Sequence, residues 1–143
     1  MKIIELGHIV LYVTNINKMV DFYKNILGFR LIAARDGMAA FSSPRTHHEL
    51  FLIEVGGKPA VSKQIKPGLY HIGLKIGNTK TELKNAIKEL RKANVKITGM
   101  SDHLVTNSIY ILDPDGNEIE LYVDVNDSWK TDPSLVFQPP KQL

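Results

Sequence analysis

Apolar and polar residues alternate at the start of the chain, which predicts a β-strand over residues 3–14. Every second residue from Ile9 to Val13 is aliphatic and falls on one face of this strand, while His8 falls on the other face. A helix is expected next, because apolar residues recur at helical spacing between Asn15, which can cap it, and Gly28, which can end it. Three short strands complete the unit, at residues 29–35, 38–42 and 49–55.

The same order of elements returns in the second half of the chain. Residues 7–15 lie over residues 70–78, and the matching residues keep one offset (8 to 71 and 15 to 78, both 63). Thr79 and Glu82 are spaced as a capping box that starts a second helix. Three strands are again expected after it, at residues 95–98, 108–112 and 117–123. We therefore predict an α+β fold of two tandem β-α-β-β-β modules whose mixed sheets curl into one cleft.

The predicted domain covers residues 1–124, with module one at 1–57, a linker at 58–68 and module two at 69–124. The linker contains two prolines and scattered lysines, which argue against regular structure. A C-terminal tail follows at 125–143, and we expect its last few residues to be disordered.

One carboxylate in the last predicted strand needs an explanation. The turn at 113–116 leads into a strand whose aliphatic residues share one face and whose Glu120 points to the other. Taken alone, Glu120 would be an ordinary solvent residue. The repeat changes this interpretation, because His8 and His71 occupy equivalent points on the same face of equivalent strands. Two imidazoles and one carboxylate facing a shared cleft are the ligand set of a facial metal site with open coordination positions.

Composition narrows the chemistry further. The chain has 143 residues, 43% of them hydrophobic and 23% charged, which is typical of one compact domain. It has no cysteine, so a metal must be held by His, Asp or Glu. No apolar run is long enough to cross a membrane and no signal peptide is evident, so we expect a cytoplasmic protein without a membrane partner. The net charge of +3 comes largely from one predicted helix face with interspersed acids, so no nucleic-acid partner is expected.

Three segments together resemble the vicinal oxygen chelate superfamily. They are GHIVLYVTNINKMVDFYKNILGF at the start, YHIGLKIG in the second module and DPDGNEIELYVD near the end. This superfamily includes glyoxalase I, extradiol dioxygenases and the fosfomycin- and bleomycin-resistance proteins. The segment SDHLVTNSIYILDPDGNEIELYVD most resembles the catechol 2,3-dioxygenase-like branch. That resemblance implies the metal ligands His8, His71 and Glu120 and the catalytic residues His103 and Tyr110.

The resemblance implies an Fe(II)-dependent, ring-cleaving dioxygenase that acts on a small catechol-like molecule, with Mn(II), Ni(II) or Zn(II) as other candidate metals. It also implies a homodimer. Without the resemblance, His103 would be a surface loop histidine and Tyr110 part of the sheet wall. One departure stands against ring cleavage, because such enzymes bring a further acid–base histidine from just before the second histidine ligand. No histidine lies between His48 and His71, so His47 or His48 would have to substitute.

Two other functions fit the same resemblance. A glyoxalase I-type isomerase takes a fourth ligand, a Glu on the last strand of the first module. Aligning HELFLIEV with NEIELYVD (48 to 117 and 55 to 124, both 69) places Phe51 opposite Glu120, whereas a shift of two would make Glu49 the fourth ligand. We favour Phe51. A metal-free binding protein of the bleomycin-resistance type is the third function, although it has no need for three convergent ligands.

Overall fold

The computed structural model describes residues 1–59 and 67–143 and contains two compact units. Unit 1 comprises the described residues up to 59 together with Pro114–Gly116. Unit 2 comprises the described residues from 67 to Asp113 and Asn117–Leu143. Each unit contains one mixed sheet and one main helical segment, so the predicted α+β fold of two modules is confirmed. The single cleft between the modules stays a prediction, and part of the predicted linker lies outside the described residues.

Unit 1 has the predicted order β-α-β-β-β. Its sheet has the strand order β1-β4-β3-β2, in which β1 and β4 run parallel and the other neighbours antiparallel. Its elements are β1 (Ile9–Val13), α1 (Ile16–Asp21), the π-helical turn η1 (Phe22–Ile26), β2 (Leu31–Arg35), β3 (Met38–Phe41) and β4 (Leu50–Glu54).

The helical segment of unit 1 begins and ends as its sequence predicts. Asn15 caps it, since its Oδ1 accepts a hydrogen bond from the Lys18 backbone N–H at 3.0 Å. Gly28 follows its end with a φ of +70°, a conformation that glycine adopts without steric cost. The core of the unit contains fully buried side chains from the helical segment and the sheet, among them Met19 and Phe41.

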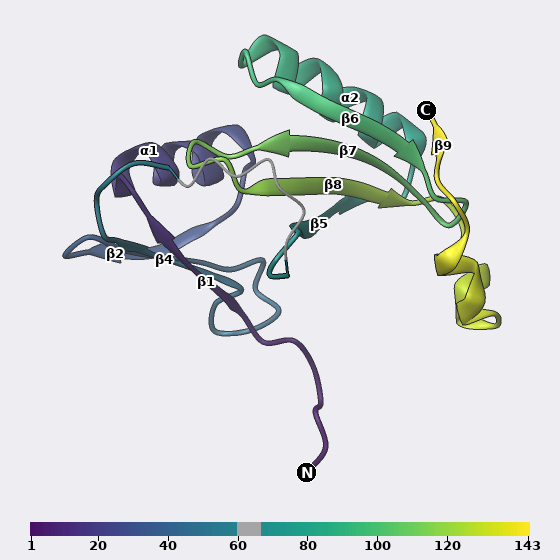
Figure 1. Ribbon diagram of the computed structural model, residues 1–143, viewed down its shortest axis with the longest axis horizontal. Coiled ribbons are helices and arrows are strands. Elements are labelled where there is room, and N and C mark those ends of the chain that lie inside the picture. The colour runs from purple at the N-terminus through teal and green to yellow at the C-terminus, as the bar shows by residue number, and fades with distance from the viewer. Residues whose placement is uncertain (60–66) are drawn as a thin grey trace. The chain divides into compact units, whose positions relative to one another are not determined.

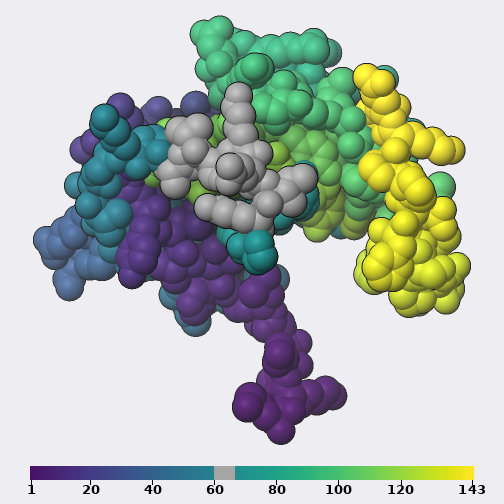
Figure 2. All heavy atoms as spheres, viewed as in Figure 1, coloured from purple at the N-terminus to yellow at the C-terminus, as the bar shows by residue number. Residues whose placement is uncertain are grey.

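The first strand is shorter than predicted. β1 begins at Ile9, and the residues before it extend away from the sheet of unit 1 (Figures 1 and 2), with Ile3, Ile4 and Leu6 71–94% exposed. The alternation continues through these residues, but β4, the neighbour of β1, begins only at Leu50, so they have no strand to pair with. The prediction of a strand from residue 3 was wrong for this reason.

Unit 2 repeats the same order and adds a tail. Its sheet has the order β5-β8-β7-β6-β9, with β5 and β8 parallel. Its elements are β5 (His71–Gly77), α2 (Lys80–Lys92), β6 (Ile97–Asp102), β7 (Thr106–Leu112), β8 (Glu118–Asp124), the 3₁₀ turns η2 (Ser128–Lys130) and η3 (Pro133–Phe137), and β9 (Lys141–Gln142).

Helix α2 covers the aliphatic face of this sheet (Figure 1) and buries Leu83 and Leu90. The predicted capping box is confirmed. Thr79 Oγ1 accepts a hydrogen bond from the Glu82 N–H at 3.2 Å, and the Glu82 carboxylate accepts one from the Asn78 N–H at 2.9 Å. In β8 the aliphatic residues are buried while Glu118 and Glu120 lie on the opposite face, as the alternation predicts.

Two predictions about unit 2 need correction. Strands β6 and β7 are longer than predicted and meet at a turn after Asp102, where the polar sequence had hidden the strand pattern. The end of the tail is ordered as β9, which pairs with β6, because β6 otherwise leaves an open sheet edge. Within the described ranges, no helix is long and apolar enough to cross a membrane.

Candidate functional site

Strand pairing in unit 2 sets the predicted site residues beside one another. β8 lies between β5 and β7, so that Glu120 is opposite Gly73 on one side and opposite Tyr110 on the other. His71 is opposite Glu118, two residues earlier on the same face of β8. A Cβ at Gly73 would lie 3.6 Å from a Glu120 carboxylate oxygen, which is an ordinary van der Waals contact.

The Glu120 carboxylate contacts two of the other predicted site residues. Its Oε2 lies 3.1 Å from His71 Nε2, and its Oε1 accepts a hydrogen bond from the Tyr110 hydroxyl at 3.3 Å. The side chain is 15% exposed, so these contacts are largely shielded from solvent. Glu120 is therefore not the solvent residue that its strand pattern alone would suggest.

His103 extends this chain of contacts. It lies in the turn between β6 and β7, where its backbone N–H donates to the Thr106 carbonyl at 2.9 Å. Its Nε2 is 2.9 Å from the Tyr110 hydroxyl oxygen. Because that hydroxyl donates its proton to Glu120, its oxygen is free to accept from His103. Four of the predicted site residues thus form one chain of polar contacts in unit 2, in the order His103, Tyr110, Glu120 and His71.

The environment of Tyr110 keeps its hydroxyl protonated. Burial, followed by the negative charge of Glu120 and the hydrogen bond to it, raises the pKa of Tyr110 to about 12. At neutral pH this side chain therefore acts as a hydrogen-bond donor.

His8, the remaining predicted ligand, belongs to unit 1 and lies in a cluster of histidines. Its ring centroid is 4.5 Å from that of His48 and 5.9 Å from that of His47, and the Nδ1 atoms of His47 and His48 are 2.7 Å apart. Burial and then the neighbouring His47 and His8 lower the pKa of His48. Across the described residues, no group of three His, Asp or Glu side chains is arranged to hold a metal. The three-ligand centre therefore stays a prediction.

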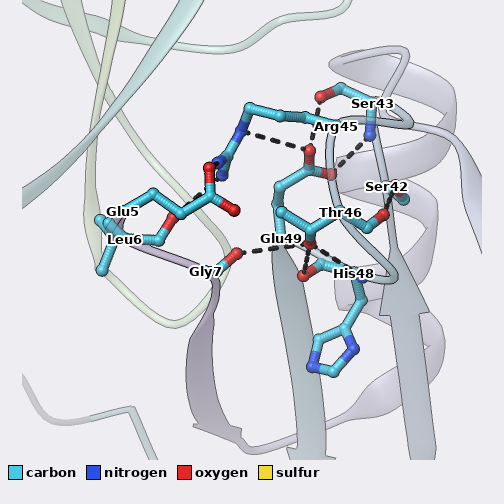
Figure 3. Close-up of polar contacts among 9 residues, drawn as sticks. All are labelled: Glu5, Leu6, Gly7, Ser42, Ser43, Arg45, Thr46, His48 and Glu49. Carbon is cyan, nitrogen blue, oxygen red and sulfur yellow. Dashed lines mark hydrogen bonds and ion pairs between the residues drawn. The ribbon is translucent and has the colours of Figure 1, made fainter. Parts of the chain in front are cut away.

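The pairing in unit 1 supports the predicted alignment of Phe51 with Glu120. Val10 pairs with Phe51 in the same way that Gly73 pairs with Glu120. Glu49, the candidate fourth ligand, is engaged elsewhere (Figure 3). Its carboxylate accepts hydrogen bonds from the Ser43 N–H at 2.6 Å and the Ser43 hydroxyl at 2.8 Å.

The charge state of Glu49 follows from these contacts. Burial raises its pKa, but the hydrogen bonds from Ser43 and its neighbours outweigh burial, so the pKa of Glu49 is lowered overall. Arg45 adds an ion pair, with Nε 3.7 Å from Oε1 of Glu49. The carboxylate thereby holds the loop before β4 in place.

The sequence as a whole matches one family model. Residues 5–121 match the Glyoxalase/Bleomycin resistance protein/Dioxygenase superfamily. The chain belongs to this superfamily. Among curated relatives of this superfamily member is the catechol-2,3-dioxygenase of Bacillus subtilis, 30% identical over 129 residues, which are 90% of this chain and 45% of the relative. The chain spans 45% to 63% of the length of the first three curated relatives that it matches.

Solved structures of two other proteins show the same superfamily fold. A glyoxalase/dioxygenase from Nostoc punctiforme has a TM-score of 0.70 at 20% identity, covering 86% of this chain and 92% of its own. A lactoylglutathione lyase from Agrobacterium tumefaciens has a TM-score of 0.64 at 17% identity, covering 85% of this chain and 95% of its own. At these identities the likeness concerns the fold alone.

The donors in unit 2 suit the divalent metal that this superfamily implies. His71 Nε2 and Glu120 Oε2 are a nitrogen and an oxygen from adjacent strands that already approach one another, and such mixed donors suit Fe(II), Mn(II) or Zn(II).

Sequence reasoning missed two residues next to this site, Tyr70 and Glu118. The alternation places Glu118 on the polar face of β8, but only the pairing of β5 with β8 shows that it lies opposite His71.

Proposed function

We propose that this superfamily member is an Fe(II)-dependent extradiol-type dioxygenase that cleaves the ring of a small catechol-like substrate. His8, His71 and Glu120 would hold the metal. The observation that carries the proposal is the chain of contacts from His103 through Tyr110 and Glu120 to His71. A His–Tyr pair next to two metal donors is suited to moving protons during ring cleavage. The 30% sequence identity between this chain and the catechol-2,3-dioxygenase of Bacillus subtilis supports the same reaction.

When bound, Fe(II) would supply the Lewis acidity and the redox chemistry for the catechol and dioxygen. The protein residues have separate tasks. Tyr110 keeps its proton on Oη at neutral pH and presents it as a hydrogen-bond donor to an anionic oxygen. His103 Nε2, 2.9 Å from that Oη, orients the hydroxyl by donating a hydrogen bond to its oxygen. Glu120 holds the hydroxyl through Oε1 and leaves Oε2 to the metal.

The further acid–base histidine that extradiol enzymes bring before their second histidine ligand is missing here. Of the two substitutes considered, His48 has the ring nearer to His8, with centroids 4.5 Å apart compared with 5.9 Å for His47. We assign the substitute role to His48. His48→Asn should then reduce turnover more than His47→Asn, with metal content unchanged in both.

We also propose that the protein acts as a homodimer. The exposed apolar residues Ile3, Ile4 and Leu6 before β1 support this, because such a patch is usually covered by a partner. Sedimentation of the purified chain tests it. In a dimer that exchanges modules, His8 of one copy would join His71 and Glu120 of the other.

The experiment is anaerobic loading of the purified protein with Fe(II), followed by metal analysis and an assay with catechol for the yellow ring-fission product. We expect about one Fe(II) per complete site and oxygen-dependent product. His8→Ala, His71→Ala and Glu120→Ala should each lose the metal, and Tyr110→Phe should keep the metal while turnover falls by about 10²–10⁴-fold. If the wild-type protein binds no metal, and metal addition does not change its thermal stability relative to His8→Ala, the proposal fails.

A glyoxalase I-type isomerase is the second candidate, because the sequence lacks the usual acid–base histidine of ring cleavage. Turnover of a hemithioacetal with Ni(II) or Zn(II), without turnover of catechols, would establish it. The contacts of Glu49 with Ser43 count against this candidate, since they occupy the carboxylate that would be the fourth ligand. Tight binding of a ligand without metal or turnover would instead support a resistance-type binding protein.

A further inference from the structure

Two polar atoms face one another beside the proposed metal donors without forming a hydrogen bond. His71 Nδ1 and Glu118 Oε1 are 3.8 Å apart, and both are buried. Neither has a hydrogen-bond partner in the part of the chain that the structure describes. Leaving buried polar atoms unpaired is energetically unfavourable, because each has lost its hydrogen bonds to water. Such a pair therefore suggests an interaction that closes in another state of the site.

These two atoms are left unpaired because the His71 ring lies between two carboxylates. Strand pairing places Glu118 directly opposite His71, and Glu120 follows two residues later on the same face of β8. Nε2 of the ring lies 3.1 Å from Glu120, while Nδ1 faces Glu118. A neutral imidazole carries only one N–H and can donate to only one of the two carboxylates. The short contact on the Nε2 side and the long one on the Nδ1 side fit a proton on Nε2.

Tyr70 lies next to both members of this pair. The negative charge of Glu118 is the largest cause that raises the pKa of Tyr70, so the Tyr70 hydroxyl lies near this carboxylate. The ring of Tyr70 also packs against the ring of His71, with centroids 4.6 Å apart. One side chain therefore contacts both members of the unpaired couple.

We propose that Glu118, oriented by Tyr70, is a positioning residue that accepts a hydrogen bond from His71 Nδ1 and leaves Nε2 unprotonated for a metal ion. This inference rests on the proposed metal site. With Nε2 given to a cation, the single ring proton resides on Nδ1, where Glu118 is the acceptor that faces it. The proton changes position on the ring and no net proton is released. A carboxylate behind a ligating imidazole fixes the tautomer and makes the ring a stronger donor.

Unit 1 lacks this arrangement at the equivalent position. Under the alignment that pairs Phe51 with Glu120, Glu49 corresponds to Glu118 (49 and 118 differ by 69, as do 51 and 120). The oxygens of Glu49 accept hydrogen bonds from Ser43 instead. The positioning role therefore belongs to His71 and not to His8.

The test uses ¹⁵N NMR of the histidine rings together with Zn(II) titration of the full chain. The variants are Glu118→Ala, Glu118→Gln and Tyr70→Phe, with Glu89→Ala on the exposed face of α2 as the matched control. In the Zn(II)-loaded wild type we expect the proton of His71 on Nδ1. Glu118→Ala should raise the Kd for Zn(II) by about 10–100-fold and shift the Nδ1 resonance in both metal-free and loaded protein. Glu118→Gln and Tyr70→Phe should have smaller effects, and Glu89→Ala none.

The outcomes separate this inference from the proposed function. An unchanged Nδ1 resonance in Glu118→Ala, with or without Zn(II), overturns the positioning role, even if the affinity falls through loss of charge. A wild-type protein that binds no metal, but whose Nδ1 resonance moves in Glu118→Ala, contradicts the proposed function and supports the contact between Glu118 and His71. Circular dichroism and thermal melting check that each variant folds. If Glu118→Ala does not fold, the isosteric Glu118→Gln still tests the proposal.

Discussion

The two units share one architecture but differ on the sheet face that is not covered by helices. In unit 2, Gly73, Glu120 and Tyr110 stand side by side on three neighbouring strands. In unit 1 the same three places hold Val10, Phe51 and Ala40. The side that packs against the helices is aliphatic in both units.

This difference shows how a repeated module specialises. The buried side of each sheet must remain apolar for the unit to fold, so the repeat is strongest there. The other side carries no such constraint, and its residues decide the chemistry. On this face unit 1 has His8 and the apolar side chain of Phe51, while unit 2 has the connected polar residues. The experiments below test each part of this comparison.

The largest effect is expected in the two cores, where the units should be equivalent. Phe41 in unit 1 and Ile111 in unit 2 occupy matching positions and are both 0% exposed. Phe41→Ala should lower the free energy of unfolding by about 3–5 kcal/mol and Ile111→Ala by about 2–5 kcal/mol. Urea denaturation of the metal-free protein measures both. If one variant costs less than 1 kcal/mol, the two cores are not equivalent.

The next largest effect is expected on Zn(II) affinity, which should differ between the two units. Glu120→Ala removes a proposed metal ligand, so the Kd for Zn(II) should rise more than the roughly 10–100-fold typical of losing an outer-shell partner. Phe51→Ala changes the equivalent position in unit 1 and should leave the Zn(II) affinity unchanged. Calorimetric titration compares the two. Equal losses in both variants would show that the polar face of unit 2 has no special role in metal binding.

The fold could be predicted from sequence because its signals are local and repeated. The cap at Asn15, the capping box at Thr79 and the alternation in β8 are each visible in a few consecutive residues, and all three were confirmed. The first strand was overextended because alternation does not reveal whether a neighbouring strand exists. The end of the tail was wrongly expected to be disordered, since its pairing with β6 depends on contacts between distant residues.

The site was predictable only in part. The repeat brought His71 and Glu120 together and the resemblance added His103 and Tyr110, and their contacts in unit 2 agree with that grouping. Glu118 was missed, because a carboxylate on the polar face of a strand looks like a solvent residue until its partner is known. The contacts of Glu49 were also out of reach, since they depend on how the loop before β4 folds back onto it.

A smaller effect should distinguish the two helix starts. Thr79 Oγ1 accepts from the Glu82 N–H and donates to the Glu82 carboxylate, so Thr79→Ala removes both of these hydrogen bonds. The start of α1 keeps a second partner when Asn15 is lost, because the Ile16 N–H donates to Glu54 at 2.6 Å. Thr79→Ala should therefore cost about 1–2 kcal/mol of unfolding free energy and Asn15→Ala about 0.5–1 kcal/mol. The reverse order in thermal or urea unfolding would contradict this account.

The smallest effect concerns pH and the polar face of unit 2. The pKa of Tyr110 is raised from 10.0 to about 12 in the folded protein, mainly by burial and then by Glu120. Below pH 10 the hydroxyl is protonated in both folded and unfolded chains, so its ionisation adds no pH dependence. Between pH 10 and about 12 the unfolded chain releases this proton while the folded chain keeps it, so the free energy of unfolding falls as pH rises.

Tyr110→Phe lacks this proton and isolates its effect from the other groups that titrate at high pH. The difference in unfolding free energy between wild type and Tyr110→Phe should stay constant from pH 7 to pH 9, and should then move against the wild type up to pH 12. Urea unfolding in the presence of a metal chelator measures it. A difference that stays constant over the whole range would mean that Tyr110 is not buried beside Glu120 in solution. Unit 2 would then lose the connected polar face that sets it apart from unit 1.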